Sequence, residues 1–204
     1  MMNTIQIGAR TLIPSKVVCI GRNYVDHIAE LNNEIPDDMV VFIKPNSAIS
    51  STLKAFHQEP IHYEGELCFV YEQGRFSAVG FGLDLTKRGL QNKLKAKGLP
   101  WERAKAFDGA ALFSEFVPIH ADDNAFTFDL SIDQQIVQQG NRGLMIYSPD
   151  TILSELSTFI TLNDGDIVMT GTPKGVGEIN AGASFTGQVY LAEQLLVTQT
   201  WRAE

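Results

Sequence analysis

The sequence of 204 residues contains no hydrophobic run long enough to cross a bilayer. Its longest apolar stretches, residues 16–20 and 67–71, fall far short of the roughly 20 residues that a transmembrane helix needs. The first residues, MMNTIQIGAR, also lack the charged start and the apolar core of a signal peptide. We therefore expect a soluble protein without a membrane partner.

Runs of positive charge are also missing, and the formal net charge is −8. A protein that follows a phosphate backbone needs a basic patch, so nucleic acid is not an expected partner. Cysteine is scarce as well: Cys19 and Cys68 lie in separate apolar segments and form no CxxC pair. Such thiols are typical of a reduced core, which indicates a cytoplasmic compartment.

Internal repeats, low-complexity tracts and linkers are absent, so residues 1–204 are expected to form one domain. Short segments with strand patterns outnumber those with helical patterns. We predict strands at 16–20, 40–44, 64–72, 75–79, 126–132 and 166–170, and helices at 24–31, 86–97 and from 148 onward. We expect Thr86 to cap the second helix and Ser148, followed by Pro149, to cap the third, whose apolar stripe includes Phe159. This pattern predicts an α+β fold that is mostly β, built on sheets with a few short helices.

Two acidic residues in a strand are the most informative feature. Glu64 and Glu66 are spaced i, i+2, so their side chains project from the same face of the strand. Asp84 is a third carboxylate in an apolar setting just before the next helix. Three carboxylates would make an all-oxygen site that suits Mg²⁺ or Mn²⁺. The alternative is an exposed strand edge, with Asp84 as a turn or helix-capping residue.

A histidine and a glutamate share one face of the first predicted helix. His27 and Glu30 are spaced i, i+3, which places both side chains on the same side. The spacing alone favours a surface histidine with a helical partner. A longer pattern is needed to assign chemistry to this pair.

Four blocks in a fixed order supply that pattern. They are CIGRNYVDH at 19–27 followed by Glu30, FIKP at 42–45, EGE at 64–66 and VMTGTPKGVG at 168–177. Together with residues 82–91 and 99–107, these blocks resemble the fumarylacetoacetate hydrolase family, in its small single-domain acylpyruvase and oxaloacetate decarboxylase branch. The resemblance implies a mixed β-sandwich or β-roll, normally assembled as a homodimer.

The resemblance also implies roles for residues. Glu64, Glu66 and Asp84 would bind Mg²⁺ as the cofactor, with Mn²⁺ as the alternative. His27 and Glu30 would be the dyad that activates water or moves a proton, with Glu30 fixing the histidine tautomer. Lys105 would bring a positive charge to the substrate.

Four further residues would bind substrate by the same resemblance. Arg88 and Gln91 lie i, i+3 on the helix predicted at 86–97, although a solvent-facing helix is the competing interpretation. Thr172 would offer hydroxyl and backbone N–H groups to a carboxylate. Arg22 would either bind substrate or support its loop.

The sequence departs from the family pattern in two places. Relatives usually carry R-D-x-Q where this chain has Arg88-Gly89-Leu90-Gln91, so a carboxylate that could orient Arg88 is missing. A turn that is typically Asn-Gly is replaced near Asp133-Gln134-Gln135. We expect the second change to affect a hairpin and not the chemistry.

The resemblance favours a hydrolase that cleaves the C–C bond of a small β-diketo acid of the acylpyruvate or fumarylpyruvate type. The alternative is an oxaloacetate decarboxylase or an oxaloacetate enol–keto tautomerase that uses the same metal site. A second alternative is a catalytically inactive binding homologue. The presence of His27, Glu30, Lys105 and the three carboxylates together argues against inactivity.

Overall fold

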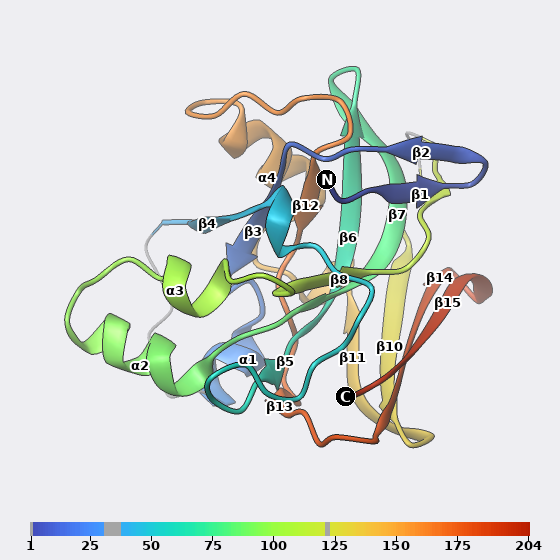
Figure 1. Cartoon of the computed structure of the whole chain (residues 1–204). Helices are drawn as coiled ribbons and strands as arrows, with labels where there is room; N and C mark the ends of the chain where they lie inside the picture. Colours follow the sequence, from blue (N-terminus) through green and yellow to red (C-terminus); the bar gives the residue numbers. More distant parts are fainter. Residues whose placement is uncertain (1, 31–37, 121–122) are drawn as a thin grey trace.

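Two β-sheets dominate the structure (Figure 1). The computed structural model describes residues 2–30, 38–120 and 123–204, and the side chains of residues 27–29 lie outside the description. The larger sheet has seven strands in the order β4-β3-β12-β6-β7-β8, with β9 also paired to β7. The smaller sheet has four strands in the order β11-β10-β14-β15. This mostly β architecture with short helices confirms the predicted fold class.

The seven-stranded sheet carries the acidic pair. Its strands are β3 Lys16–Gly21, β4 Val40–Pro45, β6 Gly65–Glu72, β7 Arg75–Asp84, β8 Ala111–Phe113, β9 Val117–Pro118 and β12 Ile167–Met169. The predicted strands at 16–20, 40–44, 64–72, 75–79 and 166–170 correspond to β3, β4, β6, β7 and β12. Strand β6 begins one residue later than expected, so that Glu64 lies directly before it. Strand β7 is longer than predicted and runs to Asp84.

The four-stranded sheet packs on one face of the larger sheet. It consists of β10 Phe126–Ile132, β11 Gln135–Asn141, β14 Ser184–Leu191 and β15 Gln194–Arg202. Phe128 and Leu130 of β10 point inward and join one apolar cluster with Leu67, Phe69 and Phe81 of the larger sheet. The contact is close because Gly187 has no side chain: a Cβ there would lie 2.1 Å from the ring of Phe81.

The altered turn leaves the β10–β11 hairpin intact. Asp133 and Gln134 both adopt positive φ angles, 48° and 70°, as a tight two-residue turn requires. The Asp133 carboxylate also accepts a 2.9 Å hydrogen bond from Ser184 N. Because this turn tolerates Asp and Gln, the hairpin forms without the Asn-Gly pair.

The other face of the larger sheet is covered by an N-terminal hairpin of β1 Ile5–Ile7 and β2 Arg10–Leu12. Ile5 and Ile7 pack into a second apolar cluster with Cys19 and Cys68, which are both buried free thiols. A separate two-stranded sheet pairs β5 His62–Tyr63 with β13 Gly177–Glu178. The prediction that both cysteines are reduced core residues agrees with this placement.

In the part of the chain that the structure describes, six short helical segments connect the strands. They are α1 Val25–Glu30, α2 Arg88–Ala96, α3 Glu102–Lys105, α4 Pro149–Leu156 and the 3₁₀ turns η1 Asn46–Ala48 and η2 Arg142–Leu144. Figure 1 shows α2 and α3 side by side at one edge of the molecule, with α3 next to β4. Across the described ranges, no helix is both long and apolar enough to cross a membrane.

Two details of the predicted helices were wrong. Thr86 does not cap α2, because Lys87 occupies that position and makes no side-chain cap, while the Thr86 hydroxyl faces Lys105. Helix α4 does begin at the expected Ser148 cap, whose side chain accepts a bond from Thr151 N. It ends at Leu156, however, so Phe159 leaves the predicted apolar stripe and is 60% exposed.

Candidate active site

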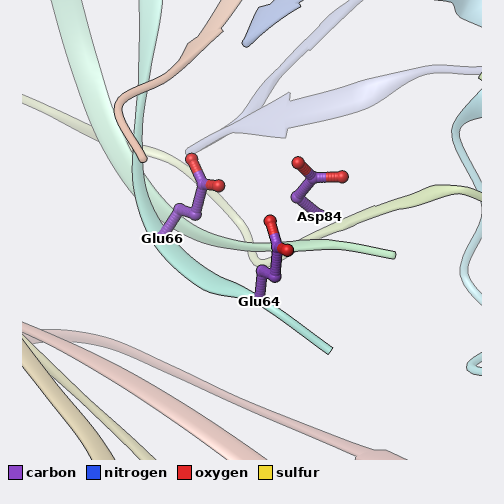
Figure 2. A group of neighbouring side chains, drawn as sticks. All are labelled: Glu64, Glu66 and Asp84. Atoms are coloured by element: carbon purple, nitrogen blue, oxygen red, sulfur yellow. The ribbon is translucent and has the colours of Figure 1, made fainter. Parts of the chain in front are cut away.

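Three carboxylates converge at the end of the β6–β7 pair. Glu66 lies on β6, Glu64 directly before it, and Asp84 is the last residue of β7. The antiparallel pairing brings them together, since the backbone N–H of Asp84 donates a 2.8 Å hydrogen bond to the carbonyl of Glu64. Figure 2 shows the side chains pointing toward a common point. One oxygen from each lies within 4.8 Å of the others, and all three residues are buried.

Positive side chains surround two of these carboxylates. Lys105 Nζ donates hydrogen bonds of 2.8 Å to Glu64 Oε2 and 2.7 Å to Asp84 Oδ2. Lys44 Nζ, which is fully buried, lies 2.7 Å from Asp84 Oδ1, and Arg88 pairs with Glu64 Oε1. Burial disfavours the charged ammonium of Lys105, but Asp84 and Glu64 outweigh it and raise the pKa of Lys105. These positive side chains offset the negative charge of the two carboxylates.

Glu66 has a different environment. Its Oε2 accepts a 2.6 Å hydrogen bond from Gly171 N, and within the described residues no ion pair reaches its carboxylate. Burial raises the pKa of Glu66 well above its ordinary value, and the charges of Asp84 and Glu64 raise it further. A divalent cation among the three carboxylates would supply the missing charge. The all-oxygen donor set fits Mg²⁺ or Mn²⁺.

The carboxylates form the floor of a small pocket of about 40 Å³, which is room for an ion and a few water-sized atoms. Four cationic side chains and two aromatic rings line it: Arg22, Arg88, Lys95, Lys105, Phe42 and Trp101. Burial, followed by the positive charges of Arg22 and Arg88, lowers the pKa of Lys95. The pocket therefore concentrates positive charge above an acidic floor and suits an anionic ligand.

Arg88 and Gln91 both line this pocket from α2. Arg88 Nη1 donates a 2.8 Å hydrogen bond to Gln91 Oε1, as their i, i+3 spacing predicts, and Gln91 is buried. The structure thus places both residues toward the pocket and not toward solvent. Their contact with substrate stays a prediction.

Relatives carry an aspartate where this chain has Gly89, and the Glu59 carboxylate lies close to that position. Its Oε1 accepts a 3.1 Å hydrogen bond from Leu90 N in the first turn of α2, which has no acidic residue of its own. A Cβ at Gly89 would lie 3.2 Å from the same oxygen. Glu59 therefore satisfies a free N–H group at the start of the helix that carries Arg88.

The loop after β12 closes another side of the pocket. Gly171 has a φ of +100°, and a Cβ there would lie 2.8 Å from Asn23 Cβ. Asn23, which is fully buried, donates a 2.8 Å hydrogen bond to the carbonyl of Thr170. Thr172 lines the pocket, but its hydroxyl already donates to Gly65 O at 2.9 Å. Any contact between Thr172 and substrate would therefore also use its backbone.

The predicted dyad is only partly visible. His27 lies on α1, but its side chain is outside the described residues. The Glu30 carboxylate accepts hydrogen bonds from Gly175 N at 3.0 and 3.2 Å, so α1 lies against the loop that follows β12. Lys174 and Asp26 add an exposed ion pair of 3.1 Å between the same two segments. The pairing of His27 with Glu30 stays a prediction.

Comparison with known proteins assigns the chain to a family. The family model described as fumarylacetoacetate (FAA) hydrolase C-terminal matches residues 16–197. The chain is a member of the fumarylacetoacetate hydrolase family. This confirms the resemblance drawn from the four sequence blocks and identifies the protein as a relative of this family's enzymes.

Individual family members resemble the chain over most of its length. The oxaloacetate tautomerase YcgM of Escherichia coli K12 is 37% identical over 190 residues, covering 84% of this chain and 87% of its own length. The human mitochondrial oxaloacetate tautomerase FAHD1 is 34% identical over 205 residues, covering 92% and 91%. The crystal structure of fumarylpyruvate hydrolase from Pseudomonas aeruginosa in complex with Mn²⁺ and pyruvate superposes with a TM-score of 0.89 at 27% identity, covering 99% and 95%.

Within this family member, some site residues had no role assigned from sequence. Lys44 belongs to the F-x-K-P block, but nothing in its spacing showed that it would pair with Asp84. Lys95 lies shortly before the block at 99–107 and Trp101 lies within it, and only the placement of α2 and α3 brings both side chains to the pocket. Gln138 lies in a strand of the other sheet, and its contacts to Gly65 and Thr172 depend on how the sheets pack.

Proposed function

We propose that this protein is a Mg²⁺- or Mn²⁺-dependent oxaloacetate enol–keto tautomerase, with residues 1–204 acting as one catalytic domain. The observation that carries the proposal is the buried cluster of Glu64, Glu66 and Asp84 in a pocket that is also lined by four cationic side chains. The names of the E. coli and human relatives support the oxaloacetate reaction over the C–C bond hydrolysis that the motifs first favoured.

The charge of the site supports a dicarboxylate substrate. The charge of the three carboxylates is balanced by three positive side chains, Lys44, Arg88 and Lys105, which contact Glu64 and Asp84. A divalent ion would then leave an excess of two positive charges, which complements the two carboxylates of oxaloacetate. Arg22 and Lys95 add further positive charge at the pocket wall.

Tautomerisation removes a proton from the 2-hydroxyl oxygen of the enol and adds one at C3, while the C2=C3 double bond becomes single and the C2–O bond becomes a carbonyl. It cleaves no carbon–carbon σ bond and consumes no water. The bound ion would withdraw electron density from the 2-oxo group and stabilise negative charge on its oxygen. Lys105, held by Asp84 and Glu64, would keep a second positive charge beside that oxygen. Arg88 and Gln91 would orient a substrate carboxylate from α2, and Arg22 and Thr172 would complete the pocket wall.

His27 and Glu30 are proposed to carry the proton. Glu30 lies where α1 meets the loop after β12, at one side of the pocket region. Its carboxylate would fix the tautomer of the histidine. A homodimer in the cytoplasm, without nucleic-acid or membrane partners, also stays a prediction; the free thiols of Cys19 and Cys68 support a reducing compartment.

A hydrolase of the fumarylpyruvate type is the second candidate, favoured by the similarity to the P. aeruginosa enzyme. The decisive experiment compares three reactions in Mg²⁺ with and without EDTA. These are loss of the enol absorbance of oxaloacetate, release of pyruvate from oxaloacetate, and cleavage of acetylpyruvate and fumarylpyruvate. Asp84→Asn protein and protein-free Mg²⁺ serve as controls.

We expect enol loss to be the fastest reaction and to fall to the protein-free rate with EDTA and in Asp84→Asn. Metal-dependent cleavage of an acylpyruvate that exceeds enol loss would instead establish the hydrolase. Faster pyruvate release would establish the decarboxylase. Mn²⁺ binding without turnover of any of these acids would identify an inactive binding homologue.

A further inference from the structure

Gln138 connects the outer sheet to two sides of the acidic site. It lies on β11, at the edge of the four-stranded sheet, and is 1% exposed. Its Oε1 accepts a 2.9 Å hydrogen bond from Gly65 N. Its Nε2 donates to Thr172 Oγ1 and to Pro173 O, both at 2.9 Å. One amide therefore holds the strand of the acidic pair and the loop after β12 together.

The hydrogen-bond network fixes the orientation of this amide. The Thr172 hydroxyl donates its hydrogen to Gly65 O, so it accepts from Gln138. Pro173 O can only accept, and Gly65 N can only donate. Oxygen and nitrogen of the Gln138 amide are thereby assigned without ambiguity. Position 138 therefore needs a side chain that accepts from Gly65 N and also donates to Thr172 Oγ1 and Pro173 O. An ionised carboxylate or an apolar side chain cannot do both.

Both segments approach Gln138 closely. A Cβ at Gly65 would lie 3.0 Å from Gln138 Oε1, and a Cβ at Gly175 would lie 2.1 Å from Val137 O. The loop and the strand therefore contact β11 at points where only glycine fits without displacement.

The two segments held by Gln138 carry the acidic site. Gly65 separates Glu64 from Glu66, so a shift at Gly65 moves both carboxylates. The loop contributes Gly171 N, which hydrogen-bonds to Glu66 Oε2. We infer that Gln138 is a positioning residue that sets the distance between the acidic strand and the loop, and through it the geometry of the metal site.

This inference deepens the proposed function and rests on it for the metal. Gln138→Met removes both hydrogen-bonding arms with little change in volume. Gln138→Glu keeps an acceptor for Gly65 N but loses the donor to Pro173 O. Gln139→Met is the matched control, because this neighbouring side chain is exposed and bonds only to Asp129 among the described residues.

The first measurement is amide hydrogen exchange without metal. We expect Gln138→Met to accelerate exchange in segments 64–67 and 170–176, and Gln138→Glu to accelerate it mainly in 170–176. The control should match the wild type in both. Unchanged exchange in both Gln138 variants would overturn the inference, and this readout does not depend on the reaction catalysed.

The second measurement is Mn²⁺ affinity, followed by electron paramagnetic resonance, together with kcat and KM. We expect Gln138→Met to weaken Mn²⁺ binding by about tenfold or more, as loss of groups that support metal ligands commonly does. We expect kcat to fall more than KM rises, since the substrate contacts on α2 are untouched. If the wild type binds Mn²⁺ but turns over no oxo-acid, the proposed function fails, and the Mn²⁺ and exchange data still decide the role of Gln138.

Discussion

Lys105 donates a 2.7 Å hydrogen bond to Asp84, and both side chains are buried beneath the pocket. The ammonium group also bonds to Glu64, so it occupies the space between two of the three carboxylates. A cation from the chain thus already neutralises part of the acidic cluster. Divalent metal and lysine would compete for the same oxygens.

The Lys105→Met variant tests this competition. We expect Mn²⁺ affinity to rise by about tenfold, because a positive charge close to the ion is removed. We expect kcat/KM to fall by about a hundredfold or more, since stabilisation of the substrate oxyanion is lost. Without metal, stability should fall by about 3 kcal/mol, because the acids lose a buried partner. Calorimetric Mn²⁺ titration and steady-state kinetics measure these effects.

The matched control for this variant is Lys93→Met, an exposed position on α2. It should leave Mn²⁺ affinity and activity near the wild-type values. Weaker Mn²⁺ binding in Lys105→Met would show that the lysine organises the carboxylates and does not compete with the ion.

The Glu66→Gln variant should separate stability from metal binding. Because burial and two neighbouring acids disfavour its charge, the neutral amide should stabilise the metal-free protein by about 1 kcal/mol. The bond from Gly171 N can persist to the amide oxygen. Thermal unfolding in EDTA should show a higher Tm than the wild type, while added Mn²⁺ should raise only the wild-type Tm.

Glu72→Gln is the control at the other end of β6, where the carboxylate pairs with Arg10 at 2.8 Å near the surface. It should lose a little stability and keep the Mn²⁺ response. A Glu66→Gln protein that is less stable than the wild type in EDTA would contradict the repulsion described for the cluster.

Gly171→Ala should strain the loop that bonds to Glu66. The residue has a φ of +100°, and the new Cβ would lie 2.8 Å from Asn23 Cβ and 3.0 Å from Ile20 O. We expect a loss of about 3 kcal/mol in the free energy of unfolding, measured by urea denaturation, together with weaker Mn²⁺ binding. Gly182→Ala has a similar φ of +85° with no atom within 4 Å, so it should cost only about 1 kcal/mol. Equal losses in the two variants would rule out the collision as the cause.

Asp166→Asn should make stability less dependent on pH. Burial acts to raise the pKa of Asp166, but hydrogen bonds from Lys16, Asn163 N and Ser15 outweigh it and lower the pKa below its usual value. A carboxylate with a lowered pKa stabilises the fold above its unfolded-state pKa, and the stabilisation is lost as pH falls through the folded-state pKa.

At pH 7 we therefore expect Asp166→Asn to cost about 2 kcal/mol, because a charged acceptor is replaced by a neutral amide. The difference from the wild type should shrink below about pH 4, near the ordinary aspartate pKa. Urea denaturation across pH 3–7 measures it. A difference that stays constant over this range would show that the charge of Asp166 does not contribute.

The sequence predicted the parts of the fold that depend on local pattern. Alternating apolar residues located β10, and the Ser148-Pro149 pair located the start of α4. The i, i+2 rule placed Glu64 and Glu66 on one face, where the structure has them. The family motifs led to the same acidic residues and to Lys105 in α3, a helix with no periodic signal of its own because it has only four residues.

Other features could not be predicted because they depend on packing between distant segments. Thr86 looked like a helix cap, yet its hydroxyl bonds to Lys105 from a different element. Glu59 lies some thirty positions before Leu90 in the chain, and only the folded loop brings its carboxylate to α2. No local pattern distinguishes Gln138 from the exposed Gln139 beside it, because β11 could in principle be paired with either face inward.

The hydrogen bonds of Gln138 to Gly65, Thr172 and Pro173 limit which segments of this protein could be exchanged with those of its relatives. Because the β10–β11 hairpin contributes none of the three carboxylates, replacing it with the hairpin of a relative would be expected to leave the metal site unchanged. Yet if the hairpin taken from a relative paired with its register shifted by one residue, the side chain at position 138 would face outward. Gly65 N and Pro173 O would then lose their hydrogen bonds to the Gln138 amide. A chimaera with a hairpin from a relative should therefore accept almost any outward-facing side chain on β11, but it should require glutamine at position 138.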